Sequence, residues 1–150
     1  MDTSWQIVVA SSNLEGRRRI TTVLRQLGLD PICLSSVSQC RELLGKEQVN
    51  LIFCDRVLPD GDYDDIVAAS HATEGRPPVV LACRHNNSEY LKAIGSGVFG
   101  VITEACHPSD VEWMMIKAKR DYFKRAQTRP GSGPQKTVPI GQTTGGVTLK

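Results

Sequence analysis

Short apolar segments alternate with segments of helical periodicity along the first 127 residues, and this alternation most constrains the fold. The apolar segments predict five strands, over residues 6–10, 29–34, 49–54, 79–83 and 98–103. In the intervening segments, apolar residues recur at intervals of three and four, which predicts helices. Strands that alternate with helices form parallel sheets covered on both faces. We therefore expect an α/β fold with a doubly wound, five-stranded parallel sheet.

Capping signals mark several of the predicted helix boundaries. A serine followed three residues later by Glu or Gln has the spacing of a capping box, and it occurs at Ser12 with Glu15, Ser36 with Gln39, and Ser109 with Glu112. Gly28 fits the end of the first helix. Two further helices are expected over residues 64–71 and 88–94. The sequence thus predicts five β-α units.

The composition changes from Thr128 onward, where Pro, Gly, Thr and Ser predominate. Such a segment has little to bury and is typical of a flexible linker. We expect a domain over residues 1–127 and a disordered tail over 128–150. The end of the chain is basic, since residues 117–150 hold 8 Lys and Arg against 1 acid. It has no recognition motif and few interleaved aromatics, so we expect no nucleic-acid binding.

The cysteines and the hydropathy pattern indicate the cellular compartment. The five cysteines are scattered and contain no Cys-x-x-Cys pair: Cys33, Cys40, Cys54, Cys83 and Cys106. This argues against a disulfide framework or a zinc ribbon and favours reduced thiols. No apolar run approaches the roughly 20 residues that span a bilayer, and no signal peptide opens the chain. We expect a cytoplasmic protein without membrane association.

Asp55 is the main candidate site residue. It ends the apolar segment 49–54 and begins a loop that continues to Gly61. In open α/β sheets, the ligand-binding and catalytic residues lie in loops at the carboxyl ends of buried strands. The alternative is a loop carboxylate with a local cap or ion pair. Four more aspartates follow and could form a cation site, although we expect a solvated turn and helix N-terminus: Asp60, Asp62, Asp64 and Asp65.

A second candidate cluster follows the fourth and fifth strands. Cys83, His85, Cys106 and His107 carry the ligand types of a soft-metal site. Such a site needs four ligands that converge at about 2.0–2.3 Å from the ion. Loops rarely achieve this without selection for it, so we expect ordinary packing or exposure for these four side chains.

Several motifs match a known family. They are Ile7-Val-Val9, Leu27-Gly28, Asp55 with Leu58-Pro59-Asp60-Gly61, and Ala93-x-x-x-Gly97-x-x-Gly100. With these residues, the segment 1–125 resembles the receiver domain of two-component response regulators. The resemblance implies a (βα)5 flavodoxin-like fold with Asp55 as phospho-acceptor. It also implies a protein partner, either a histidine kinase or a downstream signalling protein, and allows a homodimer.

The remaining positions of that family's phosphorylation site are substituted in this chain. The resemblance places the family's two Mg²⁺-binding acids at Ser11 and Ser12, its strand-four hydroxyl residue at Ala82, and its lysine at Glu104. Hydroxyls are poor Mg²⁺ ligands, alanine cannot hydrogen-bond a phosphoryl group, and glutamate would repel one. We therefore expect a degenerate pseudo-receiver that acts by protein–protein interaction, without catalytic residues, metal or cofactor.

Two alternatives remain open. One is a functional phosphorelay receiver that accepts phosphate on Asp55, which would need Mg²⁺. The other is a phosphohydrolase with Asp55 as nucleophile. That chemistry needs a second acid two residues later, where this chain has Val57, and no Gly-x-Ser-x-Gly or Walker motif is present. We therefore expect that the protein is not an enzyme.

Overall fold

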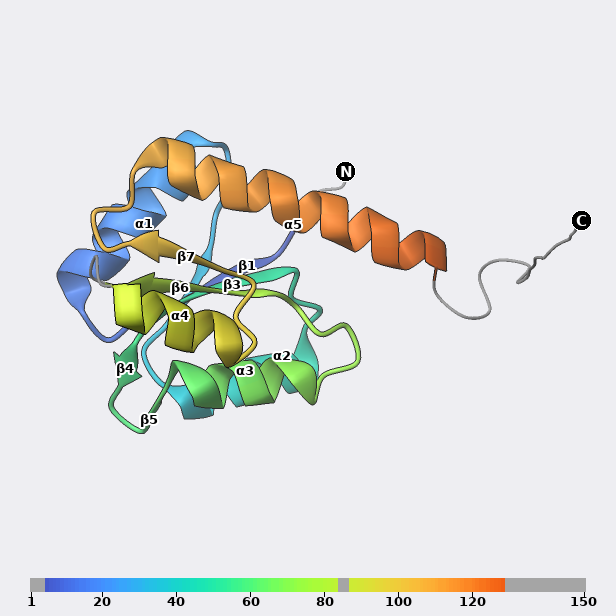
Figure 1. Ribbon diagram of the computed structural model, residues 1–150, viewed down its shortest axis with the longest axis horizontal. Helices are drawn as coiled ribbons and strands as arrows, with labels where there is room; N and C mark the ends of the chain where they lie inside the picture. Colours follow the sequence, from blue (N-terminus) through green and yellow to red (C-terminus); the bar gives the residue numbers. More distant parts are fainter. Residues whose placement is uncertain (1–4, 84–86, 129–150) are drawn as a thin grey trace, which may run out of the picture. The chain divides into compact units, whose positions relative to one another are not determined.

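The computed structural model describes residues 5–83 and 87–128, and its central feature is a parallel five-stranded sheet (Figure 1). The strands are β1 (Ile7–Ala10), β2 (Ile32–Leu34), β3 (Leu51–Asp55), β6 (Val79–Cys83) and β7 (Gly100–Thr103), in the order β2-β1-β3-β6-β7. The helices are α1 (Leu14–Gln26), α2 (Val37–Lys46), α3 (Tyr63–His71), α4 (Asn87–Gly95) and α5 (Pro108–Thr128). The predicted α/β fold with a doubly wound parallel sheet is confirmed.

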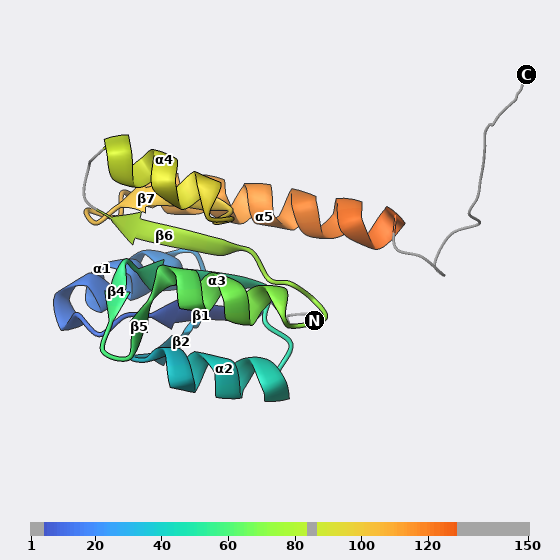
Figure 2. The same cartoon turned by 60° about the horizontal axis from the view of Figure 1, so that its bottom comes forward.

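Helices cover both faces of the sheet, and each face has its own hydrophobic core (Figures 1 and 2). On one face, side chains of α2, α3 and α4 such as Cys40, Ile66 and Ala93 pack on the sheet. On the other, Leu24 of α1 and Val111 of α5 pack on it. The strands contribute to both cores because successive side chains point to opposite faces. Strand β3, buried from Leu51 to Cys54, lies at the sheet centre as its apolar run predicts.

The chain divides into two compact units, Met1–Ala118 and Lys119–Lys150, and α5 runs across the boundary. In the described part of the second unit, Arg125 and Asp121 form an ion pair with an N–O distance of 3.1 Å. The disordered tail predicted for 128–150 lies outside the described residues, apart from Thr128. Within the ranges 5–83 and 87–128, no helix is both long enough and apolar enough to cross a membrane.

Several helix ends differ from the expected boundaries. Helix α5 begins at Pro108, so Ser109 lies inside its first turn rather than before it, and α4 spans Asn87–Gly95 rather than 88–94. Asn13, not Ser12, is the N-cap of α1, and its side-chain oxygen accepts a 2.7 Å hydrogen bond from the amide of Gly16. Ser12 lies one residue too early to reach the first turn. Helix α3 begins at Tyr63 rather than at 64, because Asp62 and Asp65 form a capping box there. The predicted end of α1 is confirmed by Gly28, whose φ of +86° suits glycine.

The loop after β3 contains a small antiparallel hairpin that the sequence pattern did not reveal. Its strands are β4 (Val57–Leu58) and β5 (Gly61–Asp62), which lie near the N-terminal end of α2 (Figure 2). Asp60 in the turn accepts hydrogen bonds from the amides of Val37 and Ser38, at 2.8 and 2.9 Å. These bonds hold the pKa of Asp60 below its ordinary value. The carboxylate therefore caps α2 from outside the helix.

Candidate functional site

The residues singled out from the sequence line one pocket. Ser11, Ser12, Asp55, Ala82 and Glu104 all border a cavity of about 960 Å³ at the carboxyl edge of the sheet. The site lies where the chain reverses its winding direction, since β2 and β3 flank β1 on opposite sides. A crevice at such a switch point is the usual ligand site of a doubly wound sheet. The fold thus brings all five positions together at one edge.

Ser11 and Asp55 are in direct contact at the floor of the pocket. The Ser11 hydroxyl lies 2.7 Å from Oδ2 of Asp55 and 3.0 Å from the carbonyl oxygen of Asn13. One hydroxyl proton cannot serve both acceptors fully, and a charged carboxylate is the stronger one. Ser11 therefore donates to Asp55 whenever that carboxyl is ionised. Strands β1 and β3 fix the pair, because Ala10 and Cys54, the residues before them, are register partners.

Asp55 is partly buried, and its surroundings disfavour its charged form. Burial is the largest cause that raises the pKa of Asp55, and the negative charge of Glu104 adds to it. The hydrogen bond from Ser11 and those from the amides of Asn13 and Ser12 act in the opposite direction. The net result is a pKa above the ordinary 3.8. The pocket thus stabilises the anionic form of this carboxylate less than water does.

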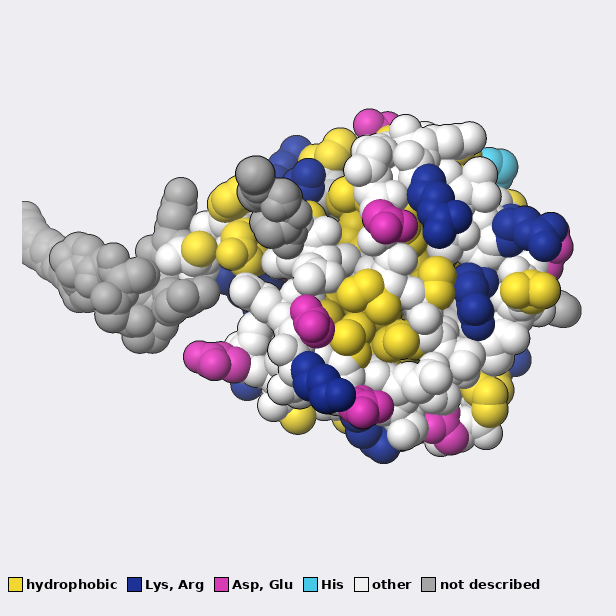
Figure 3. Space-filling model, turned by 180° about the vertical axis from the view of Figure 1, so that it is seen from behind, with side chains coloured by type: hydrophobic (Ala, Val, Ile, Leu, Met, Phe, Trp, Pro, Cys, Tyr) yellow, Lys and Arg dark blue, Asp and Glu magenta, His cyan; other side chains and the backbone are white. Residues whose placement is uncertain are grey.

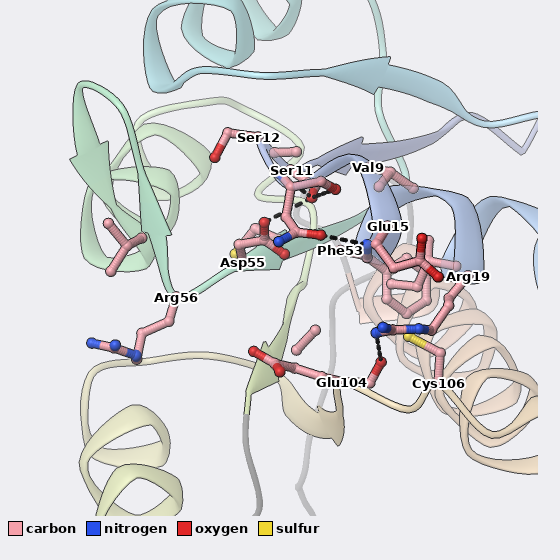
Figure 4. Close-up of a pocket in the computed structure, with 17 residues that line it drawn as sticks. Val9, Ser11, Ser12, Glu15, Arg19, Phe53, Asp55, Arg56, Glu104 and Cys106 are labelled. Carbon is pink, nitrogen blue, oxygen red and sulfur yellow. Dashed lines mark hydrogen bonds between the residues drawn. The ribbon is translucent and has the colours of Figure 1, made fainter.

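The positions opposite Asp55 carry neither a hydroxyl nor a cation. Ala82 is the register partner of Asp55 on β6 and presents only a methyl group to the pocket. Glu104 follows β7, and Figure 4 shows its carboxyl group pointing toward Asp55. The guanidinium of Arg19 donates a 3.0 Å hydrogen bond to the backbone carbonyl of Glu104 (Figure 4). Arg19 thereby joins α1 to the loop after β7.

Two charged residues of the pocket were not among the candidate site residues of the sequence analysis: Glu15 and Arg19. Arg19 belongs to a run of three arginines, which gave a signal but did not show which of them faces the sheet edge. Arg17 instead donates a 2.8 Å hydrogen bond to the carbonyl of Ser11. The sequence pattern indicates Glu15 only as a capping residue. Periodicity places a residue on a helix face but does not predict its contacts with a loop far along the chain.

The thiol of Cys106 is poorly suited to nucleophilic chemistry. Its pKa is raised to about 11, chiefly by burial; the charge of Arg19 lowers the pKa, and the charges of Asp55 and Glu104 raise it. The thiol form therefore predominates at neutral pH. Cys83 and Cys106 belong to the cores on opposite faces of the sheet, so the soft-metal cluster considered from the sequence does not assemble. His85 lies outside the described residues, and His107 is exposed.

Comparison with solved structures shows which fold this is. The receiver domain of an HD-domain protein from Pseudomonas fluorescens matches with a TM-score of 0.73 at 17% identity, covering 85% of this chain and 97% of that one. The receiver domain of a Francisella response regulator matches with a TM-score of 0.66 at 15% identity, covering 81% and 98%. This chain has the receiver-domain fold. No family model and no curated protein matches the sequence.

A third receiver structure provides a contrast at the metal site. The receiver domain of a sensor histidine kinase from Pseudomonas aeruginosa matches with a TM-score of 0.68 at 14% identity, covering 81% of this chain and 99% of that one. That structure has a magnesium ion coordinated in its active-site cleft. In the described part of the present receiver fold, no three His, Cys, Asp or Glu side chains come together as metal ligands. Beside Asp55 the pocket has the hydroxyls of Ser11 and Ser12 in place of carboxylates, and hydroxyls are poor Mg²⁺ ligands, so these residues do not fit a Mg²⁺ site.

Proposed function

We propose that this chain is a signalling module of the two-component type whose receiver fold acts through protein contacts, without conventional Mg²⁺-dependent phosphorylation. The observation that carries the proposal is the hydrogen bond from Ser11 to Oδ2 of Asp55. It engages the carboxylate through a neutral hydroxyl at the carboxyl edge of the sheet. Asp55 is then a structural residue of the pocket rather than a phosphate carrier.

The electrostatics of the pocket support the same conclusion. Phosphoryl transfer to a carboxylate gathers negative oxygens, and a cation must neutralise them. Here Glu104 faces Asp55 and raises its pKa. The methyl group of Ala82 offers no hydrogen bond to a phosphoryl oxygen. Catalysis is likewise not part of the proposed function, because Cys106 is held in its thiol form and Val57 stands where a phosphohydrolase needs an acid.

The proposed partner is a protein, either a histidine kinase or a downstream component of the pathway, with a homodimer as a further state. The proposal places the module in the cytoplasm and includes no role for cofactors or nucleic acid. On the face drawn in Figure 3, Lys and Arg side chains lie among Asp and Glu side chains, and several basic groups lie near one another at the right of the view.

The test is intact-mass spectrometry after incubation with acetyl phosphate and Mg²⁺, with Asp55→Asn as the control. We expect no adduct on either protein. A mass gain of about 80 Da that is lost in the control would contradict the proposal and establish a phosphorelay receiver. A metal-dependent thermal shift, measured by adding Mg²⁺ alone, checks the metal independently. We expect the melting temperature to be unchanged.

A further inference from the structure

The hydroxyl of Ser11 lies between two hydrogen-bond acceptors and has one proton to donate. Its oxygen is 2.7 Å from Oδ2 of Asp55 and 3.0 Å from the backbone carbonyl oxygen of Asn13 (Figure 4). The same oxygen accepts a hydrogen bond from the amide of Asn13, with an N–O distance of 3.2 Å. A serine hydroxyl donates one hydrogen bond and accepts up to two. This cluster therefore has two complete arrangements, which differ in the direction of the Ser11 hydroxyl.

The charge of Asp55 selects between the two arrangements. When Asp55 is ionised, Ser11 donates to it, since a carboxylate is a stronger acceptor than a carbonyl. A proton taken up from water is best placed on Oδ2, because Ser11 can accept it, whereas the amides of Ser12 and Asn13 at this carboxyl only donate. Oδ2 then becomes the donor in the 2.7 Å contact, and the Ser11 proton must turn to the carbonyl of Asn13. Every partner is already within hydrogen-bonding distance, so no heavy atom has to move.

The carbonyl of Asn13 connects this cluster to helix α1. It accepts a 2.9 Å hydrogen bond from the amide of Arg17, in the first turn of the helix. Asn13 is also the N-cap, whose side chain accepts from the amide of Gly16. A carbonyl oxygen has two lone pairs, so it can accept from Ser11 and Arg17 together. Because linked hydrogen bonds polarise one another, proton uptake at Asp55 changes the hydrogen bonding at the start of α1.

The surroundings of Asp55 favour proton uptake at a higher pH than for a carboxyl group in water. Partial burial is the largest cause that raises the pKa of Asp55, the hydrogen bonds from the loop after β1 lower it, and the charge of Glu104 raises it. Among the described residues, β6 contributes only Ala82 to the pocket. The other ionisable groups that line the pocket come from α1, from β3 and the residue after it, and from the loop after β7: Glu15, Arg19, Cys54, Arg56, Glu104 and Cys106.

We propose that Asp55 is a proton-controlled switch, in which a proton on Oδ2 reverses the hydrogen bond with Ser11 and turns the Ser11 hydroxyl to the carbonyl of Asn13. The inference goes beyond the proposed function, because it concerns the free carboxyl group and requires no phosphate, metal or partner. Ser12 and Leu14, on either side of Asn13, are exposed. The segment that responds to the proton therefore lies at the surface, where its hydrogen bonding differs between acid and neutral solution.

Nuclear magnetic resonance of the ¹³C-labelled full-length chain, followed from acid to neutral pH, tests the switch. We expect the side-chain carboxyl carbon of Asp55 and the backbone carbonyl carbon of Asn13 to titrate with one midpoint. In Ser11→Ala the Asp55 midpoint should rise, because the ionised form loses a hydrogen bond. The shift change at Asn13 should fall by at least about half, because the hydroxyl that carries it is gone. A change of undiminished size would show that the charge of Asp55 acts directly on Asn13, and a carbonyl that does not titrate with Asp55 would likewise overturn the proposal.

A second variant keeps the test independent of whether Ser11→Ala folds. The carboxamide of Asp55→Asn can donate to Ser11 as the protonated carboxyl does. At neutral pH its Asn13 carbonyl shift should therefore lie at the acid end of the wild-type titration, and a shift at the neutral end overturns the proposal. Ser12→Ala, which removes an exposed neighbouring hydroxyl, is the matched control and should leave the Asn13 titration unchanged. A loss in Ser12→Ala as large as in Ser11→Ala would show that the Ser11 hydroxyl does not carry the response.

Discussion

The hydroxyl of Ser11 donates a 2.7 Å hydrogen bond to Oδ2 of Asp55, across 44 residues of sequence. Ser11 is buried and Asp55 is partly buried, so the bond lies where water competes poorly. It connects the carboxyl ends of β1 and β3, the two strands at which the winding reverses. The bond therefore contributes both to the stability of this edge and to the ionisation of Asp55.

Removing the donor tests the energetic role of this bond. Ser11→Ala leaves a partly buried carboxylate with one hydrogen bond fewer, and we expect the free energy of unfolding near pH 7 to fall by about 1 kcal/mol. Urea denaturation measures it. Ser12→Ala is the control, because that side chain is exposed, and its effect should stay within about 0.5 kcal/mol of zero. If the two variants lost the same free energy of unfolding, the hydrogen bond from Ser11 to Asp55 would contribute nothing measurable to stability.

The raised pKa of Asp55 sets the sign of a pH dependence. A carboxyl whose pKa is higher in the folded state favours folding when protonated. Its contribution is complete below the ordinary pKa of 3.8 and is lost as pH rises through the raised folded value. Asp55→Asn cannot ionise, so its stability relative to wild type should increase between about pH 3.5 and about pH 7. A relative stability that stays level or decreases over this range would contradict the raised pKa.

Asp60 should show the opposite sign. Its pKa is lowered by hydrogen bonds from the amides of Val37 and Ser38, so its stabilising effect is present above the ordinary pKa of 3.8 and lost as pH falls through the lowered folded value. We expect Asp60→Ala to lower the melting temperature at neutral pH and to differ less from wild type in acid. Hydrogen exchange should quicken at these two amides. Asp30→Ala, whose carboxylate is 91% exposed, serves as control and should leave their exchange unchanged.

The sheet was predictable because burial controls it. A strand covered on both faces must be apolar throughout, so the run that ends at Cys54 indicated a central strand. The pocket positions were predictable for a related reason, since the carboxyl ends of neighbouring parallel strands meet at one edge. Ser11 follows β1, Asp55 ends β3, and Ala82 lies one residue before the end of β6. Once the order of strands and helices is predicted correctly, the location of these residues at one edge of the sheet follows.

Other features depend on contacts that periodicity does not encode. The strands β4 and β5 have two residues each, too few to establish an alternation. Asn13 and Ser12 are both good N-cap residues, and only the path of the chain after β1 decides between them. The direct bond between Ser11 and Asp55 was missed because a resemblance gives positions, not the direction in which a hydroxyl points. Arg19 was missed because its partner, the carbonyl of Glu104, is 85 residues away.

Two glycines next to helix termini should respond to alanine with opposite signs. A Cβ on Gly61 would lie 2.4 Å from Oδ2 of Asp65, the oxygen that accepts from the amide of Asp62 in the capping box of α3. Gly61→Ala must displace that carboxylate, so we expect a loss of roughly 1 kcal/mol in the free energy of unfolding. A Cβ on Gly45, in the last turn of α2, meets nothing within 4 Å, and Gly45→Ala should gain about 0.5–1 kcal/mol. Chemical denaturation of both variants measures the difference. If Gly61→Ala were as stable as Gly45→Ala, the capping box between Asp62 and Asp65 would not hold the start of α3, and the hairpin beside the pocket would need another anchor.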